Sequence, residues 1–416
     1  MKITSIRTIL CSAPQEDIHM TGRTMRSAAF IVIETDSGHR GIGETYAGYF
    51  VPEQVPAVVE FYEPILLEAD PMNIDVLMRR MFVAGKFWAR VGLGSIVLSG
   101  IEMALLDLKG HILNVPVYEL LGGRCHESLP CYATGGPSNW PEDALEAKVD
   151  CYLSLGHRRV KLGAGRYQKG NEVVLPGRTP NEAAEIEVSK AAFLVNRFGP
   201  DFRLLLDGHM DNLGEKDHVW DEATASTVLH ALEAFPVDFF EEPLPYTDKS
   251  AYQSLRQNTS IPIAGGECLT SLEEWRDWLQ EKPFDLPQLD ASYMGGLTNF
   301  MKVAHHCEMQ GLPIATHAWS ATVGVAANLH AAFACRNARL VEMAAYHPSD
   351  PVRNRHIEAP LLTDLWVEPP ILKDGHLQLP GTPGLGIHLP PDFPERFPFR
   401  PGTGEFNSVH GKKLTT

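Results

Sequence analysis

Three acidic residues follow short apolar runs at regular intervals in the second half of the chain. Asp207, Glu241 and Glu267 each stand at the end of such a run. If the runs are neighbouring parallel strands, their carboxyl ends open onto one face, and the three side chains converge there. Three hard oxygen ligands at one point suit Mg²⁺, with water or substrate completing an octahedron. The alternative is that these acids only cap the helices that follow.

The next two apolar runs end in Asp290 and His317. On adjacent strands these two side chains would be close enough to hydrogen-bond. An Asp that orients and polarises a His makes a general base. A single histidine is more often a structural residue, but the regular series of polar run ends favours a catalytic role. The pattern therefore predicts a metal site with a base beside it.

The spacing of the run ends predicts the fold that holds these residues. From Asp207 to Glu342 the successive polar ends are 34, 26, 23, 27 and 25 residues apart, about the length that a strand, a helix and two loops need. Two earlier runs, Leu129–Thr134 and Arg159–Lys161, bring the number to eight, which favours a closed α/β barrel of TIM type over residues 129–365. A polar, glycine-rich insertion at 163–180 is expected to be a surface loop.

The regions on either side of the predicted barrel have different sequence patterns. In residues 1–128, the β-branched run Ala28–Thr35, the turn Asp36–Gly38 and a short run to Glu44 predict a hairpin. Apolar residues at three- and four-residue steps between Ile96 and Gly110 predict an amphipathic helix with one buried face. Proline and glycine are frequent beyond residue 366, so residues 366–416 are expected to form an irregular segment that returns to the N-terminal region.

The composition is that of a globular protein, with 44% hydrophobic and 21% charged residues. A net charge of −16 argues against a nucleic-acid or acidic-membrane partner. The seven cysteines contain no C-x-x-C pair, which predicts reduced core thiols in a cytoplasmic protein. The N-terminus has no apolar run of the signal-peptide kind, and no stretch is long and apolar enough to span a membrane.

A set of short motifs runs in order along nearly the whole chain: Ser99–Gly110, Val115–Gly123, Val160-Lys161, Leu206–His209, Phe240–Pro243, Gly265–Glu267, Asp290 with Gly295-Gly296, and His317. Together they resemble the enolase superfamily, in its mandelate racemase-like branch. The resemblance implies an α+β capping domain over a modified (β/α)₇β barrel, usually in a homo-oligomer. It also implies Mg²⁺ on the three carboxylates, a His317–Asp290 base, and removal of a proton α to a carboxylate. Glu342 matches the position that hydrogen-bonds a substrate carboxylate oxygen in this family.

Two departures from the family pattern bear on the reaction. Racemases and cycloisomerases of this family have Lys-x-Lys, with the second lysine as a base, whereas this chain has Lys161-Leu162-Gly163. Because residues i and i+2 of a strand face the same side, Gly163 leaves space beside Lys161. By the same alternation His209 should point inward beside Asp207, where racemases carry an asparagine. This combination resembles the acid-sugar dehydratases of the galactonate and mannonate type.

The expected activity is Mg²⁺-dependent dehydration of a sugar acid, an aldonate or aldarate, to a 2-keto-3-deoxy acid. His317 would remove the α-proton and His209 would protonate the leaving 3-hydroxyl, while Lys161 would add positive charge near the enediolate. Glu342 can help only if protonated, because an ionised acid would repel the same oxygen. His209 could instead only bind substrate. The chain could also be a racemase or epimerase of a 2-hydroxy acid, or a catalytically silent metal-binding regulatory protein of the same fold.

Overall fold

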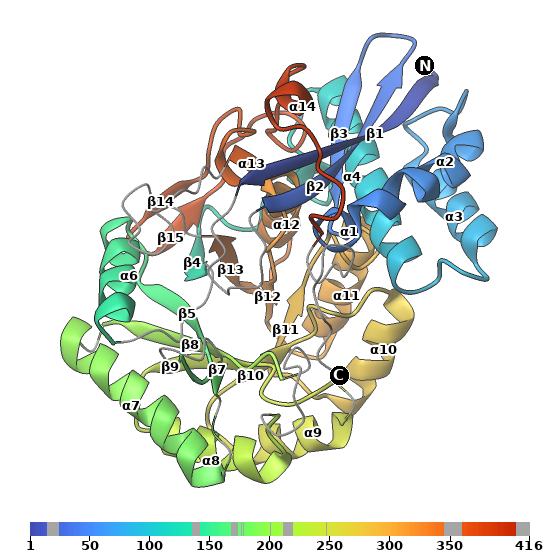
Figure 1. The fold of residues 1–416 in the computed structure, drawn as a ribbon. Coiled ribbons are helices and arrows are strands. Elements are labelled where there is room, and N and C mark those ends of the chain that lie inside the picture. The colour runs from blue at the N-terminus through green and yellow to red at the C-terminus, as the bar shows by residue number, and fades with distance from the viewer. Residues whose placement is uncertain are drawn as a thin grey trace.

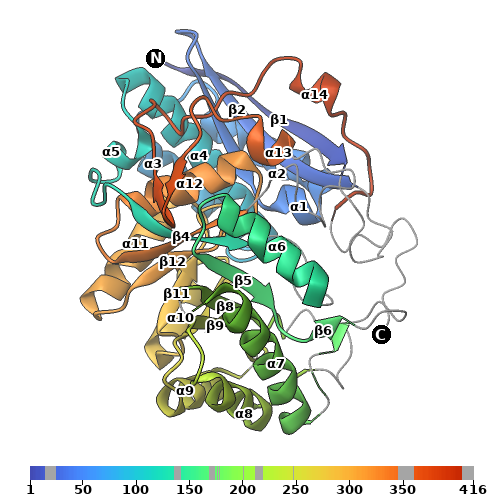
Figure 2. The same cartoon turned by 90° about the vertical axis from the view of Figure 1, so that its left-hand side faces the viewer.

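The computed structural model describes residues 1–14, 25–134, 142–167, 174–175, 177, 179–199, 201–210, 219–246, 248–344 and 360–404. Within these residues an N-terminal domain with an antiparallel sheet lies against one end of a parallel barrel (Figure 1; Figure 2). The barrel helices surround the strands, and the N-terminal domain, blue in both views, stands beside them. The predicted fold class is confirmed.

The capping domain is a three-stranded antiparallel sheet followed by helices. Its strands are β1 (Ile3–Pro14), β2 (Met25–Thr35) and β3 (Arg40–Thr45). The predicted hairpin is the β2–β3 pair, in which Ile31 lies opposite Gly43. The helices are α1 (Ala47–Phe50), the 3₁₀ turn η1 (Pro52–Gln54), α2 (Val55–Leu66), α3 (Ile74–Gly85), α4 (Leu93–Leu113) and α5 (Val117–Leu120).

Helix α4 is buried on almost every side, so the prediction of one buried face is wrong. Every residue from Gly94 to Leu108 is buried, because the helix packs against β3 of the capping sheet and also against the barrel helix α11 (Leu297–Met309). A Cβ atom on Gly41 or Gly43 would lie 2.1 or 2.0 Å from a backbone oxygen of α4. These two glycines therefore allow the close helix–strand contact.

The barrel has eight parallel strands, and the pairing of β13 with β4 closes it. The strands are β4 (Leu129–Thr134), β5 (Arg159–Gly163), β8 (Arg203–Asp207), β9 (Val237–Glu241), β10 (Ile263–Gly265), β11 (Leu286–Leu289), β12 (Ile314–Thr316) and β13 (Ala338–Ala344). Each of the eight predicted runs falls on one of them. The helices between them, besides α11, are α6 (Glu142–Ser154), α7 (Pro180–Phe198), α8 (Glu222–Leu232), α9 (Lys249–Asn258), α10 (Leu272–Glu281) and α12 (Thr322–Phe333).

A separate cluster of buried side chains fills the middle of the barrel. Seven of the eight strands contribute one residue each: Tyr132, Leu205, Phe239, Ala264, Leu286, Ala315 and Leu340. Because inward-pointing side chains of a barrel pack in layers, this cluster is a solid core and not a pore. It separates the carboxyl ends of the strands from their amino ends.

Two predicted irregular segments contain regular structure. In the 163–180 insertion, β6 (Arg166–Tyr167) pairs antiparallel with β7 (Val174–Leu175), while residues 168–173, 176 and 178 lie outside the described residues. After α13 (Pro360–Thr363) the chain forms β14 (Ile371–Lys373), β15 (His376–Gln378) and α14 (Phe393–Arg396).

The C-terminal segment returns to the capping domain only in part. Strand β15 pairs antiparallel with β4 of the barrel, whereas Phe393 of α14 packs edge-on against Phe30 of β2. The expectation that the whole segment packs on the N-terminal region is therefore corrected. The apolar Leu377 gives the reason, because it is buried where β15 meets β4.

The structure also bears on two expectations from composition. The seven cysteines are free, but Cys125 and Cys268 are exposed, so the core location holds for the other five only. In the ranges that the structure describes, no helix combines the length and apolar character needed to cross a membrane.

Buried His330 of α12 makes stability depend on pH. Its Nδ1 accepts a hydrogen bond from the Tyr118 backbone N–H at 3.1 Å, so it carries no proton there. Burial lowers the pKa of His330 to about 3, although a hydrogen bond to the Leu385 backbone opposes the shift. Below about pH 6.5 this histidine is protonated in the unfolded chain but stays neutral in the folded chain. The contribution of His330 to the free energy of unfolding is therefore fully present above pH 6.5 and is lost progressively as the pH falls toward 3.

We expect His330 to lower the free energy of unfolding by up to about 1.4 kcal/mol per pH unit across that window. Urea denaturation at pH 7 and pH 5 measures the slope. His330→Gln should flatten it, whereas the matched change His305→Gln, at an exposed position of α11, should leave it unaltered. Equal slopes in wild type and His330→Gln would refute this.

Candidate active site

Lys161 lies at the centre of a buried group of carboxylates. It is the middle residue of β5, and Asp207 and Glu241 are paired at the ends of the next two strands, β8 and β9. Lys161 Nζ is 3.1 Å from Asp207, 2.9 Å from Glu241 and 3.0 Å from Glu342. Burial lowers the pKa of Lys161, but these three carboxylates outweigh it and raise the pKa well above its usual value. Lys161 therefore stays charged inside the barrel.

The carboxylate of Glu267 lies between two histidines. Oε1 is 3.7 Å from Nε2 of His209, and Oε2 is 3.4 Å from Nε2 of His317. The His317 side chain is 6% exposed and that of His209 is 43% exposed. Two imidazoles therefore flank the Glu267 carboxylate. The imidazole of His317 lies deep in the barrel, and that of His209 lies at its mouth.

His209 reaches this position by a turn and not by strand alternation. It lies two residues beyond the end of β8, in the left-handed conformation (φ 45°) that side chains other than glycine rarely adopt. Its Nδ1 is 3.1 Å from Asp207 Oδ1. His209 therefore lies beside Asp207, as predicted. The predicted reason, alternation of side chains along a strand, is wrong, because a left-handed turn places His209 there.

Asp290 and His317 form a buried hydrogen-bonded pair. They directly follow β11 and β12, and His317 Nδ1 is 2.8 Å from Asp290 Oδ2. Asp290 Oδ1 accepts hydrogen bonds from the side chains of Ser292 (2.6 Å) and Asn328 (2.8 Å). These bonds fix the carboxylate, which in turn orients the imidazole with Nε2 toward Glu267. Burial lowers the pKa of His317, but the charge of Glu267 and the bond to Asp290 raise it to about 10.

The acids at the strand ends do not cap the following helices. The N-caps of α8, α9 and α10 are Asp221, Asp248 and Ser271, each accepting a backbone N–H through its side chain. The capping explanation for Asp207, Glu241 and Glu267 is therefore wrong, and these acids have some other role.

The residues of the site fit a magnesium ion. Asp207 Oδ1 and Glu267 Oε2 are buried oxygens that make no hydrogen bond, although an imidazole nitrogen lies 3.1 Å from the first and 3.4 Å from the second. A buried carboxylate oxygen without a hydrogen bond costs free energy that a bound cation would offset. The donors Asp207, Glu241 and Glu267 offer carboxylate oxygens, the ligand type that Mg²⁺ prefers. The donor chemistry of these residues would therefore suit a hard divalent cation.

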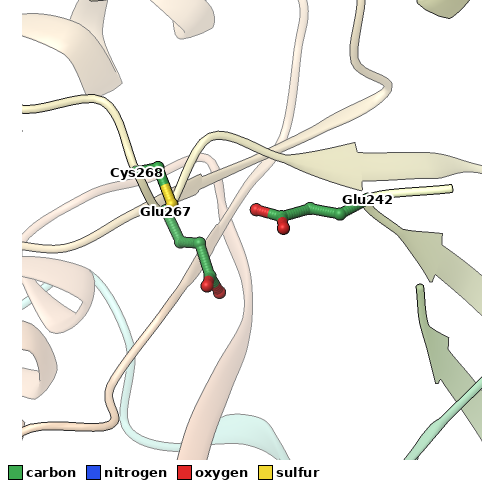
Figure 3. A group of neighbouring side chains, drawn as sticks. All are labelled: Glu242, Glu267 and Cys268. Carbon is green, nitrogen blue, oxygen red and sulfur yellow. The ribbon is translucent and has the colours of Figure 1, made fainter. Parts of the chain in front are cut away.

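The structure does not bring the three expected ligands together: in the part of the chain that it describes, Asp207, Glu241 and Glu267 do not place one oxygen each within 4.8 Å of the others, whereas an overlapping set does. Among the described residues, one ligand atom each of Glu242, Glu267 and Cys268 lies within 4.8 Å of the others, and Figure 3 shows the Glu242 carboxylate directed toward the other two residues. Glu242 is buried and accepts a hydrogen bond from the Tyr246 hydroxyl. Sequence reasoning missed both Glu242 and Cys268, although each directly follows an expected ligand. A thiol suits softer metals than Mg²⁺.

Glu342 forms an ion pair through one oxygen and accepts a backbone hydrogen bond through the other. Oε1 is 3.0 Å from Lys161 Nζ, and Oε2 is 2.6 Å from the backbone nitrogen of Ala318. Both oxygens of Glu342 face donor groups of the protein itself. Glu342 therefore supports Lys161 and the turn that follows His317.

The capping domain contributes two groups near the His317–Asp290 pair. The Tyr46 ring lies 5.8 Å from the His317 ring. Glu44 is buried, and its oxygens accept the backbone N–H groups of Ala321 (2.7 Å) and Gly324 (2.9 Å) at the start of α12. Burial raises the pKa of Glu44 to about 7. Because α12 begins shortly after His317, Glu44 links the capping domain to the segment that carries the dyad.

Known proteins resemble both parts of the chain. Residues 5–122 match the mandelate racemase / muconate lactonizing enzyme N-terminal domain, and residues 144–393 match the enolase C-terminal domain-like family. A D-galactonate dehydratase family member from Musicola paradisiaca is 26% identical over 96% of this chain and 94% of its own. D-galactarolactone cycloisomerase from Agrobacterium fabrum is 29% identical over 94% of this chain and 97% of its own.

A solved structure agrees with these matches. L-talarate dehydratase from Polaromonas sp. JS666, complexed with Mg and L-glucarate, superimposes with a TM-score of 0.77 and 26% identity. The similarity covers 95% of this chain and 96% of that one.

Proposed function

Because the chain belongs to the mandelate racemase / muconate lactonizing enzyme family of the enolase superfamily, we propose that it is a Mg²⁺-dependent hydro-lyase. It would convert a sugar acid, an aldonate or aldarate, to a 2-keto-3-deoxy acid. The relatives named for galactonate and talarate dehydration support this substrate class. Because a cycloisomerase is also among the relatives, similarity alone does not distinguish the two reactions. The choice between them must be argued from the residues of the site.

The position of the two histidines around Glu267 is the observation that carries the proposal. Loss of water needs a base for the α-proton and an acid for the leaving 3-hydroxyl. His317 and His209 approach the two oxygens of the same carboxylate at 3.4 and 3.7 Å. A substrate held beside Glu267 would therefore have an imidazole available for each task.

His317 is assigned the base. With Nδ1 bonded to Asp290 at 2.8 Å, Nε2 is the atom that would take the proton from the α-carbon. The charge of Glu267 favours the protonated imidazole, so a cation on Glu267 would lower the pKa of His317 again and free Nε2 for this step. Asp290 then stabilises the imidazolium that forms.

His209 is assigned the acid. Burial lowers the pKa of His209, whereas Asp207 and Glu267 raise it well above its usual value; a cation on these two carboxylates would lower it again, so the assignment rests on the position of Nε2, 3.7 Å from Glu267 Oε1. The proton would pass to the 3-hydroxyl as the C3–O bond breaks and water leaves. The resulting enol then tautomerises to the 2-keto acid.

The negative charge that develops on the substrate carboxylate needs compensation. Magnesium bound by Asp207, Glu241 and Glu267 would supply positive charge beside that carboxylate. Lys161 adds a second, permanently charged group held by Asp207, Glu241 and Glu342. Glu342 would position Lys161 in the free protein and contact the substrate carboxylate only after exchanging one of its present partners.

The sequence at β5 disfavours a racemase or epimerase. Such an enzyme needs a base on each face of the α-carbon, and Gly163 stands where that second base would be expected. Gly163 lies level with Asp207 in the β5–β8 pairing, so its position offers no proton acceptor. Among the residues that the structure describes around Glu267, His209 is left for that role.

Incubation with a panel of aldonates, aldarates and their lactones, with Mg²⁺, tests the proposal. We expect at least one acid to yield a 2-keto acid, detected by its semicarbazone and by mass loss of one water. A rearranged lactone would indicate a cycloisomerase, and an epimer without keto product would indicate an epimerase. No change with any acid would favour a catalytically silent regulatory protein.

The setting of the reaction is part of the proposal. We infer a cytoplasmic homo-oligomer that acts on a small acid without nucleic-acid or membrane partners. The net charge of −16 and the seven free cysteines support this setting.

A further inference from the structure

A cavity of about 450 Å³ lies at the amino ends of the barrel strands, opposite the candidate active site. Its lining includes Arg159 at the start of β5, Leu286 at the start of β11, and Arg339 and Leu340 near the start of β13. Leu286 and Leu340 also belong to the side-chain cluster that fills the barrel. This cluster therefore separates the cavity from the carboxylates at the other end.

Three of the lining residues are arginines with unused donors. Arg159 bonds Asp238 through Nε at 2.9 Å, and neither of its Nη groups donates to any part of the chain that the structure describes. Arg256 bonds Asp285 through Nε at 2.6 Å and the Lys282 carbonyl through Nη1 at 3.0 Å. Arg339 makes no hydrogen bond or ion pair with the described residues.

The charges around the cavity leave a positive excess. Asp238 and Asp285 are the acidic groups of the lining, and Asp238 is shared between Arg159 and Arg203, which bonds it at 2.7 Å. The lining therefore holds three arginines against two aspartates, in a chain whose net charge is −16. A positive group of this kind needs an explanation in so acidic a protein.

We propose that this cavity binds a small anion carrying carboxylate or phosphate groups, held by Arg159, Arg256 and Arg339. Planar guanidinium groups bind both kinds of oxyanion through paired N–H donors. The cavity volume lies within the range of about 300–1,000 Å³ typical of small-molecule sites. The site is separate from the proposed reaction, because it lies at the other end of the strands and shares no residue with the candidate active site.

Isothermal titration with inorganic phosphate and with malonate, in Mg²⁺ at constant ionic strength, tests this site. We expect saturable binding of at least one probe, and the probe that binds more tightly identifies phosphate or carboxylate as the preferred group. Arg339→Gln should weaken binding about tenfold to a hundredfold, since it removes one charged donor. Arg336→Gln is the matched control, because Arg336 is exposed, near in sequence and outside the lining.

A second variant separates this site from the active site. Glu241→Gln, which alters the candidate metal centre, should leave the Arg339-dependent binding intact. Binding that survives Arg339→Gln but disappears in Glu241→Gln would place the anion in the active site and overturn the proposal. The absence of saturable binding, or equal losses in the Arg339 and Arg336 variants, would overturn it as well.

Discussion

Glu241→Gln should reduce turnover by about 10²-fold or more and weaken Mg²⁺ binding, while the fold survives. Glu241 is buried at the end of β9, and its two oxygens accept hydrogen bonds from Lys161 at 3.1 and 2.9 Å. Glutamine keeps the shape and one acceptor oxygen but removes the negative charge. Lys161 retains Asp207 and Glu342 as partners, so the substitution leaves no uncompensated buried charge.

The adjacent residue provides the matched control for this prediction. Glu242 is also buried and belongs to the alternative ligand group with Glu267 and Cys268. If the ion is held by Asp207, Glu241 and Glu267, Glu242→Gln should lower Mg²⁺ affinity much less than Glu241→Gln does. Titration calorimetry with Mg²⁺ and turnover of the best panel substrate measure both effects. Full activity in Glu241→Gln, or in excess chelator, would refute the metal assignment.

The barrel and the line of polar residues at its strand ends can be predicted from sequence because the information is local. Each strand is a short apolar run, each run ends in a polar residue, and the repeat length matches one βα unit. Asp290 and His317 end the β11 and β12 runs, so they are close whenever these two strands are neighbours. In the structure their side chains are 2.8 Å apart. In a closed parallel barrel consecutive strands usually are neighbours.

The features that sequence reasoning missed depend on contacts between distant segments. Glu44 binds the start of α12, 277 residues further along the chain, and its hairpin pattern says nothing of that partner. The spacing of apolar residues in α4 shows one face, but a second layer covers the other faces as well. His209 is placed by a left-handed turn, which alternation along a strand cannot anticipate.

His209→Asn and His317→Asn should separate the two halves of the proposed elimination. In His209→Asn the base, its Asp290 partner and the carboxylate ligands all remain. The α-proton can then still leave and return, but the hydroxyl departs without an acid, which slows dehydration about 10²–10⁴-fold. The imidazole of His209 is 43% exposed, so its loss should not disturb the core.

Proton exchange distinguishes the variants. In D₂O, His209→Asn should exchange the α-hydrogen of the substrate for deuterium, followed by NMR, while forming little keto acid. His317→Asn should do neither, because it removes the assigned base, whose Nε2 lies 3.4 Å from Glu267 Oε2. Circular dichroism of both variants serves as the control for folding.

The opposite result would reassign the acid. If His209→Asn dehydrates the substrate at nearly the wild-type rate, His209 only binds substrate, and the proton must come from elsewhere. His317 is then the remaining candidate, since after removing the α-proton it could return that proton to the 3-hydroxyl in a syn elimination. In that case His209→Asn in D₂O should form keto acid at nearly the wild-type rate without accumulating substrate that is deuterated at the α-carbon.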